Sequence, residues 1–179
     1  MGLKFAYADP PYYGMAVKFY GDLHPEAAIY DTLEGHQALI DRLEAEYQDG
    51  WALSLSSTNL KDILPLCPAR ARVGAWVKPW TPWKPGNNPM FTWEPVIFCG
   101  GRKRDKHAPV VRDWCSVNSM MKAPKGWKGA KPMEFCWWIF DLLGMEPGDE
   151  FHDVFPGSGA VGKAYTAWLH RAPRLMDAV

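Results

Sequence analysis

Residues 150–170, EFHDVFPGSGAVGKAYTAWLH, have the pattern of a strand followed by a turn and a helix. It predicts a strand over 150–154, a glycine-rich turn and a helix over 160–170. Glycines permit the turn and let a ligand approach the backbone, and a helix N-terminus suits an anionic group such as an amino-acid carboxylate. The turn lacks the GxGxxG spacing of a dinucleotide site and the lysine of a phosphate-binding loop. The alternative is a plain strand-to-helix turn without a ligand.

The pattern upstream of this turn also alternates between strands and helices. Apolar runs predict strands over 3–8, 51–56, 72–77 and 96–99. Helical periodicity and turn signals predict helices over 35–47, 59–66 and 132–143. Residues 9–30, 78–95 and 100–131 are predicted to be loops. This order predicts an α/β sheet in a single domain spanning residues 1–179.

A second motif, Asp9-Pro10-Pro11-Tyr12, ends the first predicted strand. Ligands of open α/β sheets bind at the carboxyl ends of strands. The tetrapeptide offers a carboxylate, backbone carbonyls stiffened by proline and an aromatic ring there. An exocyclic amine needs such acceptors to orient its lone pair toward an electrophile, and its ring needs a flat surface. The alternative is an ordinary Pro-Pro turn.

Together the two motifs resemble those of the S-adenosylmethionine-dependent amino-methyltransferases of DNA, which act on adenine N6 or cytosine N4. In that family the acidic-Pro-Pro-aromatic tetrapeptide is catalytic, and the Asp-x-Phe-x-Gly-Ser-Gly turn binds the cofactor. The resemblance covers nearly the whole chain and has the permuted order in which the catalytic motif comes first. It implies a Rossmann-like methyltransferase sheet that is permuted and would be reduced at the C-terminus.

The resemblance also implies roles for individual residues. Asp9 and the carbonyl of Pro10 would accept hydrogen bonds from the target amine, with Pro11 completing the motif and Tyr12 stacking on the flipped base. The residues implied around the cofactor's methionine part are Asp153, Phe155, Gly157, Ser158 and Gly159, with Lys131 and Pro132 on its other side. Asp177, in a second strand expected over 174–179, would stand near the place of the ribose-binding acid.

The formal net charge is zero, with 20 basic and 20 acidic residues, but the charge is segregated. Residues 1–60 hold 3 basic and 9 acidic side chains (net −6), residues 61–139 hold 14 and 5 (net +9), and residues 140–179 hold 3 and 6 (net −3). Residues 78–131 are therefore predicted to be an inserted basic, Trp-rich region that recognises DNA. Trp80, Trp83, Trp93 and Trp127 could stack beside a flipped base. The alternative places these tryptophans in the core.

Composition excludes several other classes. No apolar run approaches the roughly 18 residues of a membrane span, and residues 1–10 do not resemble a signal peptide. The four cysteines, Cys67, Cys99, Cys115 and Cys136, form no CxxC pair, so we expect a reduced, cytoplasmic protein without a structural metal. The edge of the sheet near residues 150–154 would be open, which favours a homodimer or a partner subunit there.

The leading hypothesis is a compact enzyme that methylates adenine N6 in duplex DNA with a flipped target base, such as a phage or restriction-modification methyltransferase. Asp at position 9 inclines the choice toward adenine. The same chemistry on cytosine N4 or on RNA adenine stays open. So does a non-catalytic protein that binds nucleic acid or a partner.

Overall fold

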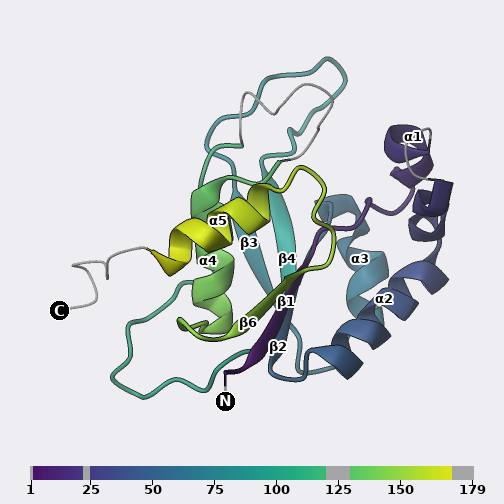
Figure 1. Ribbon diagram of the computed structural model, residues 1–179. Coiled ribbons are helices and arrows are strands. Elements are labelled where there is room, and N and C mark those ends of the chain that lie inside the picture. Colours follow the sequence, from purple (N-terminus) through teal and green to yellow (C-terminus); the bar gives the residue numbers. More distant parts are fainter. Residues whose placement is uncertain (1, 22–24, 120–129, 171–179) are drawn as a thin grey trace.

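A computed structural model describes residues 2–21, 25–119 and 130–170 (Figure 1). Six strands form one sheet in the order β5-β3-β4-β2-β1-β6. The strands are β1 Lys4–Ala8, β2 Gly50–Ser54, β3 Arg72–Val77, β4 Trp93–Gly100, β5 Trp114–Ser116 and β6 Glu150–Asp153. The predicted mixed α/β sheet is therefore present, with β6 at one end of the strand order and β5 at the other.

Strand direction determines which residues meet at each end of the sheet. β1 is parallel to β2 and to β6, and β3 is parallel to β5, whereas β4 is antiparallel to both β2 and β3. The carboxyl ends of five strands therefore lie at one end of the sheet, which we call the carboxyl end. Because β4 runs the other way, its first residues, Trp93 and Glu94, lie at that same end.

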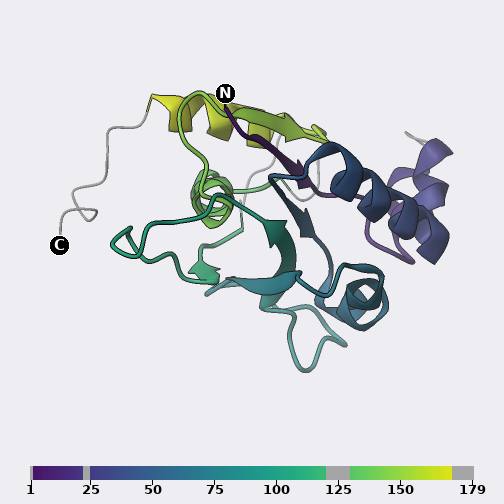
Figure 2. The same cartoon turned by 90° about the horizontal axis from the view of Figure 1, so that it is seen from below.

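Helices cover both faces of the sheet. They are α1 Ala16–Tyr20, α2 Leu33–Glu46, α3 Leu60–Ile63, α4 Met133–Leu143 and α5 Ala160–Leu169, with short 3-10 turns η1 Pro25–Asp31, η2 Ser57–Asn59 and η3 Leu64–Leu66. Figure 2 shows the strands separating α4 and α5 from α2 and α3. None of the helices in the described ranges is long and apolar enough to span a membrane.

The two faces of the sheet pack into two separate cores. Alternate residues of β1 divide between them: Phe5 and Tyr7 contribute to the core under α4 and α5, and Ala6 and Ala8 to the core under α2. All four side chains are at most 1% exposed. A strand buried on both faces reads as a continuous apolar run, which is why β1 could be predicted from the sequence.

Three local predictions differ from the structure. The predicted loop over 9–30 contains α1 and most of η1. The carboxylate of Asp31 fixes the start of α1 by accepting hydrogen bonds from the amides of Ala16 (2.8 Å) and Val17 (2.9 Å). β4 begins at Trp93 rather than residue 96. The carbonyl of Pro95 accepts a hydrogen bond from the amide of Leu55, just beyond the end of β2. The nitrogen of Pro95 faces the same side, so the proline costs the sheet no hydrogen bond. β5, at three residues, is too short for a periodic signal.

The region 78–131 is not one continuous insertion. A loop over 79–92 rises at the carboxyl end of the sheet, and a loop over 101–113 lies at the opposite end (Figure 1). The basic run that begins at Arg102 belongs to the second loop. Arg102 donates to the carbonyl of Gly144 and to the carboxylate of Asp149, far from the carboxyl end. Residues 120–129, including Trp127, lie outside the described residues.

Candidate active site

The two sequence motifs lie side by side because β1 and β6 are neighbouring parallel strands. Tyr7 is paired with Asp153, and the amide of Val154 donates to the carbonyl of Tyr7 (2.9 Å). The tetrapeptide Asp9–Tyr12 therefore leaves β1 next to the turn that leaves β6. Two segments at opposite ends of the chain thus form one site at the carboxyl end of the sheet.

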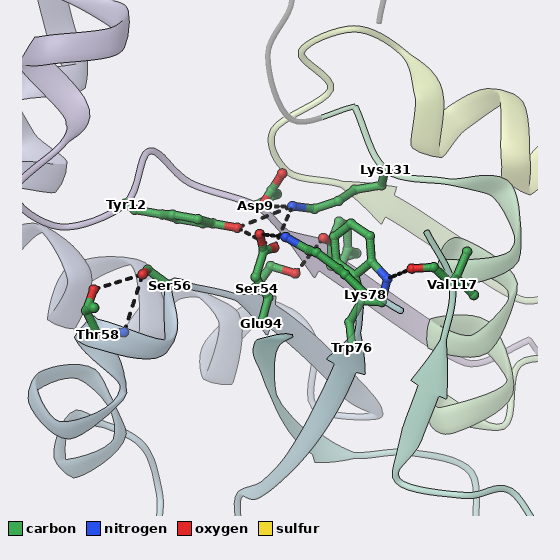
Figure 3. A network of polar contacts seen from close by, with 11 residues as sticks. Asp9, Tyr12, Ser54, Ser56, Thr58, Trp76, Lys78, Glu94, Val117 and Lys131 are labelled. Atoms are coloured by element: carbon green, nitrogen blue, oxygen red, sulfur yellow. Dashed lines mark hydrogen bonds and ion pairs between the residues drawn. The ribbon is translucent and has the colours of Figure 1, made fainter. Parts of the chain in front are cut away.

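The side chain of Asp9 forms an ion pair with Lys131. The Nζ atom of Lys131 lies 2.9 Å from Oδ1 of Asp9, without the direction of a well-formed hydrogen bond. The same ammonium donates to the hydroxyl oxygen of Tyr12 (3.3 Å) and lies 3.7 Å from Oε2 of Glu94. Lys131 is 5% exposed and Asp9 is 24% exposed. Figure 3 shows these four side chains converging.

Glu94 and Lys78 complete this group, which we call the polar cluster: Asp9, Tyr12, Lys78, Glu94 and Lys131. The Tyr12 hydroxyl donates to Oε2 of Glu94 (3.0 Å), and Lys78 forms an ion pair with the other oxygen of Glu94. Lys78 follows the last residue of β3, and Glu94 is the second residue of β4. The cluster holds two carboxylates and two ammonium groups, so its formal charge is balanced.

Burial and charge act in opposition on these groups. Burial raises the pKa of Asp9, and the Lys131 ammonium offsets part of that rise. Burial would lower the pKa of Lys131, but the Asp9 carboxylate and its other neighbours hold it well above the ordinary value. For Glu94, burial is outweighed by Lys131 and Lys78, and its pKa is lowered. Both lysines of the cluster therefore stabilise the ionised forms of Asp9 and Glu94.

A buried hydrogen-bonded pair lies close enough to Asp9 to feel its charge. The hydroxyl of Tyr7 lies 2.7 Å from Oγ of Ser54, at the end of β2, and both residues are 1% exposed. Burial raises the pKa of Tyr7 well above its usual value, so it stays a neutral phenol. Nearby, the indole of Trp76 donates to the carbonyl of Val117 (2.7 Å) and its ring contacts both Lys78 and Lys131.

Asp153, at the end of β6, has a buried carboxylate with unused acceptor capacity. Neither oxygen receives a well-formed hydrogen bond from the described residues. Burial raises the pKa of Asp153 to about 6, an effect that the nearby Phe155 amide reduces and the Asp9 carboxylate increases. Its neighbour His152 bonds instead to Tyr47. A carboxylate in this state suits a cationic ligand group.

The turn after Asp153 has free space at Gly159. Gly157 and Gly159 have φ values of 42° and 71°, and a Cβ added to Gly159 would meet no atom within 4 Å. Gly159 is the N-cap of α5, and the first amide groups of a helix have no partner within the helix. Ser158 is half-buried between the two glycines, and Phe155 packs edge-on against Tyr30 (5.3 Å).

Most residues that the resemblance implied lie at this end of the sheet, although not all in the positions expected. Pro10 is buried and Pro11 is half-buried within the tetrapeptide. Pro132 is buried and precedes α4, and it sets Lys131 at the start of that helix. The Lys131 ammonium contacts the tetrapeptide itself. Asp177 and the strand expected over 174–179 lie outside the described residues.

No protein-family model matches the sequence, and no curated protein matches it. Solved structures do share its fold. The crystal structure of an M1.HpyAVI–SAM complex has a TM-score of 0.59 at 15% identity, covering 94% of this chain and 79% of that chain. A second crystal structure, of M1.HpyAVI, has a TM-score of 0.52 at 16% identity, covering 94% and 77%. The prediction of a Rossmann-like methyltransferase fold is confirmed.

Proposed function

We propose that this protein is a methyltransferase that uses S-adenosylmethionine to methylate adenine N6 in DNA. The observation that carries the proposal is the placement of two partly buried carboxylates, Asp9 and Asp153, at the ends of neighbouring strands. Asp9 suits the target amine that receives the methyl group, and Asp153 suits the ammonium group of S-adenosylmethionine. The fold shared with M1.HpyAVI, which has been crystallised with SAM, supports S-adenosylmethionine as the methyl donor.

The residues after β6 fit the methionine part of S-adenosylmethionine. Asp153 has two acceptor oxygens for an ammonium group, and the first amides of α5 can bind a carboxylate. The free space at Gly159 leaves room for a ligand beside the turn, which also contains Phe155. The bound cofactor would supply a methyl group on a positively charged sulfur. Among the described residues, no group of three or more His, Cys, Asp and Glu side chains is arranged to hold a metal.

The tetrapeptide would hold and polarise the target amine. The Asp9 carboxylate and the Pro10 carbonyl accept hydrogen bonds from the two N–H groups of the target amine. This directs the nitrogen lone pair out of the plane of the base. Tyr12 offers its ring to the base, while its hydroxyl is fixed by Glu94. Alignment and electrostatic stabilisation are the main contributions that such a site can make. Lys131 must share Asp9 with the incoming amine.

The choice of adenine in DNA rests on Asp at position 9 and on the resemblance. Cytosine N4 and RNA adenine carry the same exocyclic amine and remain the alternatives. A partner or a second copy of the chain at the β6 edge also remains a proposal, which light scattering after size exclusion tests against a 20.2 kDa monomer. The four cysteines are all unpaired, which fits a reducing, cytoplasmic compartment.

Two measurements test the function. Calorimetry with S-adenosylmethionine should detect binding to the purified protein, and its absence would favour a non-catalytic binding protein. DNA and RNA incubated with protein and cofactor are then digested to nucleosides for mass spectrometry. We expect N6-methyladenine in DNA. Methylcytosine alone, or modified RNA alone, would overturn the assignment to adenine in DNA.

A further inference from the structure

One loop at the carboxyl end of the sheet presents a set of large apolar side chains to solvent. We call residues 79–93 the aromatic loop. Its exposed members are Trp80 (52%), Trp83 (68%), Met90 (38%), Phe91 (55%) and Trp93 (38%). The alternative that these tryptophans belong to the core is therefore wrong for the three in the loop. Exposed apolar groups gathered on one segment indicate a binding surface.

The aromatic loop is fixed at its base. The amide of Lys78 donates to the carbonyl of Thr92 (2.8 Å), and the amide of Trp80 donates to the side chain of Asn118 (2.9 Å). A turn from Lys84 to Asn87 closes its far part (3.1 Å). The rings are thus held out by hydrogen-bonded backbone, which reduces the entropy that a partner must remove on binding.

The aromatic loop is also attached directly to the polar cluster. Lys78 precedes it and Glu94 follows it, and these two side chains form an ion pair. Glu94 in turn accepts the hydroxyl of Tyr12. A nucleotide chain whose target base lies on Tyr12 would therefore have its neighbouring nucleotides close to the loop.

The loop's chemistry is aromatic rather than ionic. Lys84 is its one charged residue. A duplex is held mainly through its phosphates by several lysines and arginines, with strong salt dependence. Unpaired bases expose their faces and stack on aromatic side chains, largely irrespective of sequence. The composition of the loop fits the second mode.

Building on the proposed function, we infer that the aromatic loop binds unpaired DNA bases that flank the target, with Trp83 and Trp80 as stacking platforms. The substrate class favoured by this site is then single-stranded DNA, or a duplex opened around the target. A fully paired duplex would offer these rings only base edges and backbone.

Fluorescence anisotropy of the full-length protein tests this inference. The probes are a labelled single-stranded DNA of about 16 nucleotides, enough for one binding site, and its fully paired duplex. We expect the single strand to bind about tenfold or more tightly than the duplex. Trp83→Ala and Trp80→Ala should each weaken single-strand binding about 5- to 150-fold and leave duplex binding nearly unchanged.

Trp114→Ala is the matched control. Trp114 is 43% exposed but lies on β5, outside the aromatic loop, so its loss should change affinity less than about twofold. Circular dichroism confirms that each variant is folded. Equal binding of both probes, no binding to either, wild-type affinity in both loop variants, or Trp-dependent binding of RNA alone would each overturn the inference.

These outcomes are separate from those of the methylation assay. Methylated adenine together with wild-type affinity in the loop variants refutes the role of the loop and retains the enzyme. Trp-dependent binding of single-stranded DNA without any methyl transfer refutes the enzyme and retains the role of the loop.

Discussion

The ammonium of Lys131 and the carboxylate of Asp9 form an ion pair at 2.9 Å, in which the lysine is 5% exposed. The aspartate belongs to the first strand's end and the lysine to the start of α4. A buried lysine is stable as a cation only with such a partner. The pair therefore links the packing of α4 to the protonation state of the residue that we place at the target amine.

Replacing Lys131 with Met should destabilise the fold. The methionine keeps the apolar stem but leaves Asp9 beside Glu94 without the shared cation. Breaking a buried pair from one side costs several kcal/mol, and with Asp9 partly exposed we expect about 2–4 kcal/mol. Urea unfolding measures this loss. Lys163→Met, on the exposed side of α5, is the control, and equal stability of the two variants would contradict the proposed importance of the pair.

Replacing Asp9 with Asn should separate transfer from cofactor binding. The variant loses the negative charge that polarises the amine, so methyl transfer should fall about 100-fold or more. Affinity for S-adenosylmethionine should change little, because Asp153 and the glycine turn are intact. Asp41→Asn, an exposed substitution on α2, controls for the loss of one carboxylate. Turnover in Asp9→Asn equal to that of the control would refute the catalytic assignment.

Asp153→Asn should weaken cofactor binding and at the same time stabilise the fold at neutral pH. Burial raises the pKa of Asp153 from 3.8 to about 6, so the wild type loses stability as pH rises through that interval. The Asn variant has no such loss. Its advantage should be absent below pH 3.8, grow up to pH 6 and reach about 1–3 kcal/mol above it. Denaturant unfolding across this range measures the advantage.

The pH dependence of cofactor affinity gives a second readout of Asp153. The ionised carboxylate is the form that accepts an ammonium group. Calorimetry on the wild type should show affinity for S-adenosylmethionine falling as the pH drops below about 6. Affinity that stays flat between pH 5 and about 7 would contradict this role.

Tyr12 and Glu94 should act as a coupled pair in substrate binding. Tyr12→Phe keeps the ring but loses the hydroxyl that Glu94 holds at 3.0 Å. Glu94→Gln keeps an acceptor but loses the charge. Each should raise KM for DNA more than it lowers kcat, because the ring's orientation is what changes. In a double-mutant cycle we expect a coupling of about 0.5–1.5 kcal/mol. Tyr13→Phe, one residue along, is the control, and additive effects would rule out the coupling.

The sequence predicted the elements whose pattern is local. β1, α4 and the turn after β6 are marked by apolar runs and by prolines or glycines at their ends, and each lies within two residues of its predicted bounds. The resemblance gave Asp9 and Asp153 roles in one reaction, and the pairing of β1 with β6 brings them to neighbouring strand ends. β5 depends on its pairing with β3, and the start of α1 depends on the Asp31 carboxylate 15 residues further along the chain. Neither element had a local signal.

The polar cluster could be predicted only in part, for a reason of topology. Ligand residues in α/β sheets are sought after the ends of strands, and that rule finds Asp9 and Lys78. Glu94 comes at the beginning of a strand. It reaches the carboxyl end because β4 is antiparallel to its neighbours, which composition and periodicity alone do not indicate.

Among the described strands β6 has a single neighbour, β1, and it carries the glycine turn directly into α5. Its amides are thus protected from one side of the sheet alone, whereas those of β1 lie between two strands. Such terminal units can open locally while the remaining sheet stays closed. Hydrogen exchange should therefore be faster in β6 than in β1. A ligand bound at the turn after β6 should slow the exchange of β6 before that of the other strands.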